Sequence, residues 1–244
     1  MLPRLAIPSY KRSDTISGKT LKFLKDSNYP ADKINIFVAS YDEWERYNNA
    51  VDPDLYNEII IGRPGLMEQR NFITEFYPED EIIVQMDDDV KTIKSTLPLL
   101  SIVEMGVEHL EYRTAGLFGV LPIDDGRRFK QNITKHLTHI LGSFFVCRNH
   151  KNILITHTEK EDMERSVLYF KRYGQVLRYQ GAGVCTNYGK GTGGLQADVN
   201  RQTNITTGIT NMRNRYPEYI SVVVKNDKTT DIILNWRVKP TFTL

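Results

Sequence analysis

The sequence predicts an α/β fold in which a central, mainly parallel sheet is flanked by helices. In the first half of the chain, short apolar runs alternate with amphipathic segments, a pattern typical of parallel strands joined by helices. The 244 residues are 40% apolar and 10% aromatic, enough to bury one substantial core. The sequence has no internal repeat and no linker rich in Pro or Ser. We therefore expect a single domain over residues 1–244.

Each element of the first half has its own local signal. Apolar runs predict four strands, over residues 5–7, 34–39, 58–61 and 81–86. The gaps between them have the apolar spacing of amphipathic helices, over residues 17–26, 42–50 and 66–77. Strands and helices therefore alternate, and consecutive parallel strands need a crossover connection of this kind.

The second half has a less regular pattern. Apolar spacing predicts a helix, two strands, a second helix and a strand, over residues 98–112, 115–120, 141–146, 163–173 and 176–179. Gly174 directly follows the second helix, where glycine commonly ends a helix. Residues 181–194 contain six of the 16 glycines, which predicts a mobile or tightly folded loop rather than a regular element.

Composition leaves several kinds of partner open. Lys and Arg total 32 against 30 acidic residues, so the net charge of +2 neither requires nor excludes a polyanionic partner. No run reaches the roughly 18 apolar residues of a membrane helix, and the N-terminus becomes charged too early for a secretory signal. We expect a cytoplasmic protein without a membrane or obligate protein partner, in which Cys147 and Cys185 are buried free thiols.

Three consecutive carboxylates, Asp87, Asp88 and Asp89, follow the predicted strand in the segment EIIVQMDDDV. Ligands of open α/β sheets gather at the carboxyl ends of strands, and Mg²⁺ and Mn²⁺ prefer oxygen ligands. In an extended segment Asp87 and Asp89 point to one side, so both can reach one cation while Asp88 faces the other way. The alternative is an acidic turn that only ends the strand. Adjacent carboxylates without a cation or donors would, however, raise their own pKa values.

The order of the segments IPSYKR, GRPGLMEQRNFI and EIIVQMDDDV resembles the GT-A glycosyltransferases, in which a D-x-D motif follows the fourth strand. The resemblance implies a nucleotide-sugar-binding half over residues 1–90 and an acceptor-binding half over residues 91–244. It implies Mn²⁺ or Mg²⁺ at Asp87 and Asp89, and a UDP-sugar as donor substrate. The residues expected to contact the donor are Pro8, Ser9, Tyr10, Arg12, Arg63, Arg70, Asp87 and Asp88.

Some of these residues also have physical reasons for their roles. Tyr10 offers a flat surface for a base. Arg70 and Asn71 can donate hydrogen bonds to the nucleotide or brace the aspartate loop. Without the other motifs, they would be interpreted as exposed residues of an ordinary amphipathic helix.

A second acidic segment, within HTEKEDMERSVLYFKRYG, resembles the E-D segment that opens a helix and carries the base of inverting GT-A families. We expect Asp162 to be that base, with Glu161 as the alternate, because a carboxylate near an acceptor hydroxyl can take its proton. The alternative is that these residues only complement the positive helix N-terminus. In the segment TNYGKGTGGLQ, Lys190 is either a lid residue over the donor diphosphate or part of a surface loop.

The combined segments also resemble small phage glycosyltransferases associated with TET/JBP-type base oxidation, which implies a hydroxymethylated pyrimidine in DNA as acceptor. Basic and aromatic clusters suited to DNA are Arg127, Arg128 and Lys130; Lys171, Arg172 and Tyr173; and Arg213, Arg215 and Tyr216. Each cluster is otherwise a solvated face. The alternatives are a polysaccharide, lipid or protein acceptor, a nucleotidyltransferase, and a noncatalytic binding module. The five histidines are expected to be structural or exposed.

Overall fold

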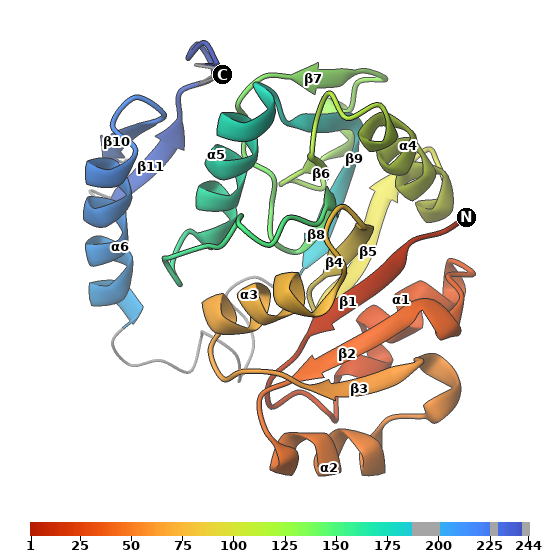
Figure 1. Ribbon diagram of the computed structural model, residues 1–244. Helices are drawn as coiled ribbons and strands as arrows, with labels where there is room; N and C mark the ends of the chain where they lie inside the picture. The colour runs from red at the N-terminus through yellow and green to blue at the C-terminus, as the bar shows by residue number, and fades with distance from the viewer. Residues whose placement is uncertain (187–200, 225–228, 241–244) are drawn as a thin grey trace.

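The computed structural model describes residues 1–186, 201–224 and 229–240, which form a central sheet covered by helices and a separate two-stranded hairpin (Figure 1). Every described part of the first half follows the predicted alternation of strands and helices. Among the described helices, none is long and apolar enough to cross a membrane.

Four parallel strands form the first half of the sheet. They are β1 (Arg4–Pro8), β2 (Ile34–Val38), β3 (Glu58–Ile61) and β4 (Ile82–Met86), paired in the order β3-β2-β1-β4. The connecting helices are α1 (Thr20–Asp26), α2 (Tyr41–Ala50) and α3 (Leu66–Phe76). Because the four strands are parallel, their carboxyl ends lie at one edge of the sheet, where the aspartate triplet follows β4.

The second half extends this sheet with strands of both directions. It contributes β5 (Val90–Ser95), β6 (Leu117–Leu121), β7 (Ile133–Lys135), β8 (Phe144–Arg148) and β9 (Leu177–Thr186). Beyond β4 the order is β8-β6-β9-β5, and β7 also pairs with β9. Strand β8 is antiparallel to β4 and β6, whereas β9 is parallel to β6 and antiparallel to β5 and β7. Strands β5, β7 and β8 therefore run antiparallel to the other six strands of this sheet.

Helices cover both faces of the sheet. Neighbouring residues of β4 belong to different cores: Val84 packs with α1 and with α4 (Leu99–Glu111), and Ile83 packs with α3 and with α5 (Glu161–Tyr173). Helix α6 (Arg201–Arg215) lies beside α5 and packs on the hairpin of β10 (Ile220–Val224) and β11 (Thr230–Leu234) (Figure 1). The first turn of α5 points toward the edge of the sheet that carries the triplet, which places the second acidic segment near the first.

Several elements differ from the sequence prediction. The prediction of a loop from residue 181 is wrong up to Thr186, because β9 continues through Gly181 and Gly183. A Cβ at Gly183 would lie 1.8 Å from the Ile123 carbonyl oxygen, so glycine here lets the backbone that follows β6 approach β9 closely. Helix α5 begins at Glu161, two residues earlier than predicted, and Gly174 ends it with φ 74° as expected.

Other elements carry weak sequence signals. Strand β5, with sequence VKTIKS, buries Val90 and Ile93, which lie three residues apart because the register shifts between Val90 and Thr92, so the strand lacks a regular alternation. It was not predicted, and neither were β7, α6 and the hairpin. Helix α1 begins later than predicted, at Thr20, after a single 3₁₀ turn.

Candidate active site

A cavity of about 580 Å³ lies at the carboxyl ends of β1 and β4 and at the start of α5. Its wall is built from the segments that the sequence singled out: residues 8–10 with Arg12, residues 63–66, the triplet at 87–89, and the first turn of α5 with Glu161 and Asp162. Residues 139 and 141–143, which precede β8, complete the wall between the two acidic segments. Segments that are far apart in the sequence thus surround one space.

The turn after β1 is held by side chains of α2. Ser9 Oγ donates to Asp88 Oδ2 at 2.5 Å and lies 2.6 Å from the Tyr47 hydroxyl, which also accepts from the Arg12 amide at 3.0 Å. The Lys11 amide donates to the buried Glu43 at 2.7 Å, and Lys11 has a left-handed φ of 55°. Glu43 and Tyr47 therefore fix the turn, and sequence reasoning missed both because they lie in an unremarkable amphipathic helix.

Asp88 and Asp89 share one cation, the Arg12 guanidinium. It contacts Asp88 Oδ1 and lies 3.2 Å from Asp89 Oδ2. Burial raises the pKa of Asp88 to about 6, since Arg12 and Ser9 offset only part of the lost hydration. Burial and the charge of Asp87 raise the pKa of Asp89 against the opposing effect of Arg12. Arg12 thus joins Asp88 to Asp89, while the predicted sharing of one cation by Asp87 and Asp89 stays a prediction.

Asp87 is held separately by Arg70 of α3. One Arg70 nitrogen donates to Asp87 Oδ1 at 2.5 Å and to the Gly142 carbonyl at 2.8 Å, and the other donates to Gln85 at 2.9 Å. The Arg70 side chain is only 3% exposed, whereas that of Asp87 is 33% exposed. Arg70 therefore braces the aspartate loop from behind, and Asn71 ties α3 to Ile155 through a pair of hydrogen bonds at 2.8 and 3.0 Å.

The donor set at the triplet fits a hard divalent cation. Asp87, Asp88 and Asp89 all line the cavity and offer carboxylate oxygens. Mg²⁺ is usually held by one or two carboxylates, with water and substrate phosphates completing the shell. Asp88 is too buried, at 5% exposure, and too fully paired to be a ligand without rearrangement. Asp87 and Asp89 are therefore the residues at which such an ion would be held.

The first turn of α5 presents two carboxylates with different surroundings. Glu161 contacts Arg165 and lies 4.0 Å from Arg70, so two buried guanidinium groups surround it. Asp162 Oδ2 lies 2.7 Å from His139 Nε2, and Asp162 Oδ1 accepts from the Met163 amide at 2.9 Å. Burial acts to raise the pKa of Asp162, but His139 and backbone donors outweigh it and the net pKa is lowered. Of the two, Asp162 is the less completely paired with cations.

Four predicted site residues remain: Pro8, Tyr10 and Arg63, which line the cavity, and Lys190. Tyr10 is 43% exposed. Arg63 also pairs with Glu75 on α3 at 2.8 Å, in a half-exposed ion pair. Lys190 lies outside the described residues, so its role, as a lid residue or as part of a surface loop, stays a prediction.

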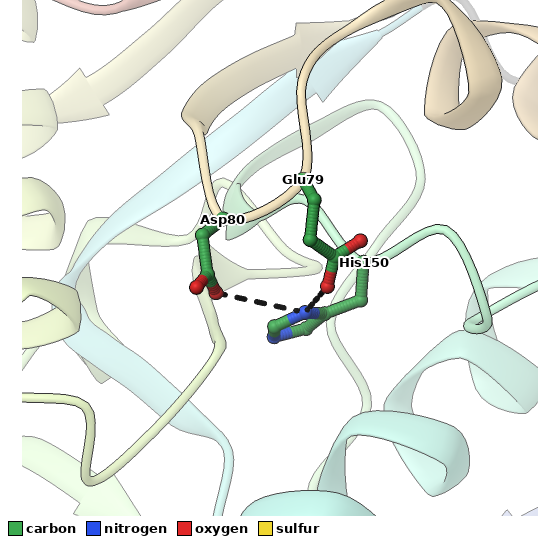
Figure 2. Close-up of side chains that lie close together, drawn as sticks. All are labelled: Glu79, Asp80 and His150. Atoms are coloured by element: carbon green, nitrogen blue, oxygen red, sulfur yellow. Dashed lines mark hydrogen bonds and ion pairs between the residues drawn. The ribbon is translucent and has the colours of Figure 1, made fainter.

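A second polar cluster lies at the other end of β4 (Figure 2). His150 Nδ1 is 2.7 Å from Glu79 and 3.8 Å from Asp80, and His150 Nε2 is 2.5 Å from the Tyr173 hydroxyl. Within the described ranges, this is the trio of side chains spaced closely enough to share a metal ion. The carboxylates already have partners, because Glu79 accepts from the Lys151 amide and Asp80 pairs with Arg113. The cluster is thus explained as a structural link between β4, β8 and α5.

Comparisons with known proteins support the fold. No protein-family profile matches the chain, and no curated protein matches it. Among solved structures, residues 1–349 of TarS from S. aureus with UDP-GlcNAc are 13% identical with a TM-score of 0.54, over 88% of this chain and 67% of that chain. A Pyrobaculum calidifontis mannosyltransferase with GDP-Man and Mn²⁺ is 15% identical with a TM-score of 0.54, over 88% and 65%.

A third solved structure matches almost the whole chain. Glucosyl-3-phosphoglycerate synthase from Mycobacterium tuberculosis, in complex with Mn²⁺, UDP and glucosyl-3-phosphoglycerate, is 12% identical with a TM-score of 0.54, over 98% of this chain and 89% of that chain. At such identities the similarity establishes the fold and nothing finer. The predicted fold, a GT-A-like mixed sheet flanked by helices, is confirmed.

Proposed function

We propose that the protein is a metal-dependent glycosyltransferase that moves a sugar from a UDP-sugar to a hydroxyl acceptor. One observation carries the proposal: a single cavity joins the carboxylates of Asp87 and Asp89 to the Asp162 segment at the carboxyl edge of the sheet. The nucleotide sugars and Mn²⁺ present in the structural neighbours add support by analogy of fold.

The residues divide into a donor side and an acceptor side. Asp87 and Asp89 would hold Mn²⁺ or Mg²⁺, which neutralises charge on the departing diphosphate. The turn of Ser9 and Tyr10 and the side chain of Arg63 lie where a nucleotide can be oriented. The acceptor hydroxyl would lose its proton at the Asp162 segment, which lines the same cavity. Glu161 is the weaker candidate because Arg165 and Arg70 surround it.

The donor part of the proposal is tested by calorimetric titration of the purified protein with UDP and GDP, with and without MnCl₂. Turnover of a panel of UDP-sugars is then followed by released UDP. We expect UDP binding that depends on Mn²⁺ and is abolished by EDTA. Absence of affinity for manganese and for every uridine nucleotide would overturn the proposal. Retention of the nucleotide in the product would instead identify a nucleotidyltransferase.

For the acceptor, we propose a hydroxymethylated pyrimidine in DNA. Two of the three basic clusters meet on one surface, since Lys171 Nζ lies 5.9 Å from the centre of the Tyr216 ring and the Arg215 guanidinium lies 5.6 Å from it. Arg127 and Arg128, in contrast, pair with Asp125. The test compares sugar transfer to hydroxymethylcytosine DNA with transfer to unmodified DNA of the same sequence. Equal UDP release with both would reject this acceptor and favour a polysaccharide, lipid or protein.

A further inference from the structure

Asp162 is poorly arranged to take a proton by itself. Its Oδ1 accepts from the Met163 amide at 2.9 Å and its Oδ2 is occupied by His139 Nε2 at 2.7 Å. Hydrogen bonds to the charged form of a carboxylate lower its affinity for a proton, which weakens it as a general base. A group in the same cavity with a ring nitrogen that has no hydrogen-bond partner is therefore a better proton acceptor.

His139 is such a group. Its ring lines the same cavity, and its side chain is 24% exposed. Nε2 faces the Asp162 carboxylate, whereas Nδ1 has no hydrogen-bond partner within the described part of the chain. When Asp162 is ionised, the hydrogen of a neutral imidazole is held on Nε2 by that carboxylate. The lone pair then resides on Nδ1, which is the state a general base requires.

The charges around His139 are consistent with this role. Asp162 of α5 stabilises an imidazolium through the 2.7 Å contact. Arg178 of β9 donates to the backbone carbonyl of His139 at 3.3 Å, and burial lowers the pKa of Arg178. Glu159, Lys160 and Glu161 line the same cavity. A carboxylate that fixes the tautomer of a histidine and stabilises its protonated form is the arrangement that serves bases in acyl transfer.

We infer that His139 is the catalytic base of the proposed transfer and that Asp162 is its positioning residue. This assignment rests on the proposed function. The acceptor O–H bond breaks and its proton moves to His139 Nδ1, while the acceptor oxygen forms a bond to the anomeric carbon. The bond from that carbon to the diphosphate oxygen breaks, and its electron pair leaves with the nucleoside diphosphate. The imidazolium then releases the proton to solvent.

His139→Gln is the deciding variant, because its amide can still donate to Asp162 but cannot take a proton at neutral pH. We expect kcat to fall by roughly 10²- to 10⁴-fold, while the donor KM and the Mn²⁺-dependent affinity for UDP change by less than about twofold. We also expect free imidazole to restore activity to His139→Ala. Thermal unfolding and UDP affinity serve as controls for folding of both variants.

The opposite outcomes overturn the assignment. If His139→Gln keeps activity within about fivefold, His139 only positions Asp162. Asp162 would instead be the base if formate or azide restored activity to Asp162→Ala while imidazole did not restore activity to His139→Ala. In both cases the wild-type protein still binds UDP and transfers sugar, so only this inference fails. Absence of any turnover or UDP binding by the wild type would overturn the proposed function itself.

Discussion

Asp87, Asp88 and Asp89 follow β4, and Glu79 and Asp80 precede it, so one strand has a cluster of carboxylates at each end. At the carboxyl end the acids line a cavity, and burial raises the pKa of Asp88 and Asp89. At the other end Glu79 is half-exposed, and hydrogen bonds from His150 and Lys151 lower its pKa.

The difference shows that spacing alone does not define a functional metal site. By spacing, the trio of Glu79, Asp80 and His150 is the better match for a cation. Its ligand atoms, however, are already satisfied by protein donors, and arginine and lysine residues surround it. The triplet is also paired with arginines, but its cavity contains the second acidic segment with Glu161 and Asp162. A cavity beside Asp80 is lined instead by Arg4, Arg113 and Arg148, so the two ends differ in the side chains that share the cavity.

The largest effect expected from this comparison separates the two clusters directly. Asp87→Asn or Asp89→Asn should lower kcat/KM for the proposed sugar transfer on the order of 10²- to 10³-fold, because a proposed carboxylate ligand of the cation is lost. The matched controls, Glu79→Gln and Asp80→Asn, should leave kcat/KM within about twofold. Steady-state kinetics with manganese titration provide the measurement. Comparable losses at both ends of β4 would contradict the assignment of the metal to the triplet.

A smaller effect is expected from the residue that braces Asp87. Arg70→Lys keeps the charge but loses the planar fork that contacts Gln85, Asp87 and Gly142. Supporting residues of metal ligands commonly account for about 10- to 100-fold in affinity or activity, so we expect a loss in that range for Mn²⁺-dependent turnover. Arg113→Lys, at the opposite end of β4, is the control and should have little effect. Equal activity of the two variants would refute the bracing role.

The smallest expected effect is on the free energy of unfolding. It compares substitution of the buried Glu164 with substitution of the half-exposed Glu79. Glu164 is fully buried and accepts from Thr156, His157 and Tyr216. Burial acts to raise the pKa of Glu164, but these donors lower it overall. Glu164→Gln should cost about 1–3 kcal/mol in the free energy of unfolding near pH 7. Glu79→Gln, at a half-exposed ion pair, should cost less.

The loss of stability in Glu164→Gln should depend on pH, because the pKa of Glu164 is lowered in the folded state. A lowered folded-state pKa stabilises the fold above the ordinary value of 4.5, and the stabilisation is lost as pH falls through the folded-state pKa. The difference between the wild type and Glu164→Gln should therefore narrow below pH 4.5 in urea titrations. A difference that stays constant down to acid pH would show that packing, rather than the charge, is responsible.

Local patterns in the sequence determined much of the fold. The apolar runs and helical spacings of the first half predicted β1 to β4 and α1 to α3 in order, and β3 to the residue. They also placed the triplet directly after β4. These features depend on side-chain periodicity within a few residues, which is why one sequence suffices to find them. The local patterns did not predict strand β5 or the glycine-containing part of β9, because these strands are stabilised by pairing with each other.

Only the tertiary structure determines which side chains share a site and how their pKa values are shifted. The partner of Asp88 lies 76 positions away at Arg12, that of Asp87 lies 17 away at Arg70, and that of Asp162 lies 23 away at His139. Residue types and spacing identify carboxylates as candidates, but their pKa values depend on burial and on neighbours brought in by the sheet. The histidine expected to be structural or exposed thus lies in the cavity, in contact with the predicted base.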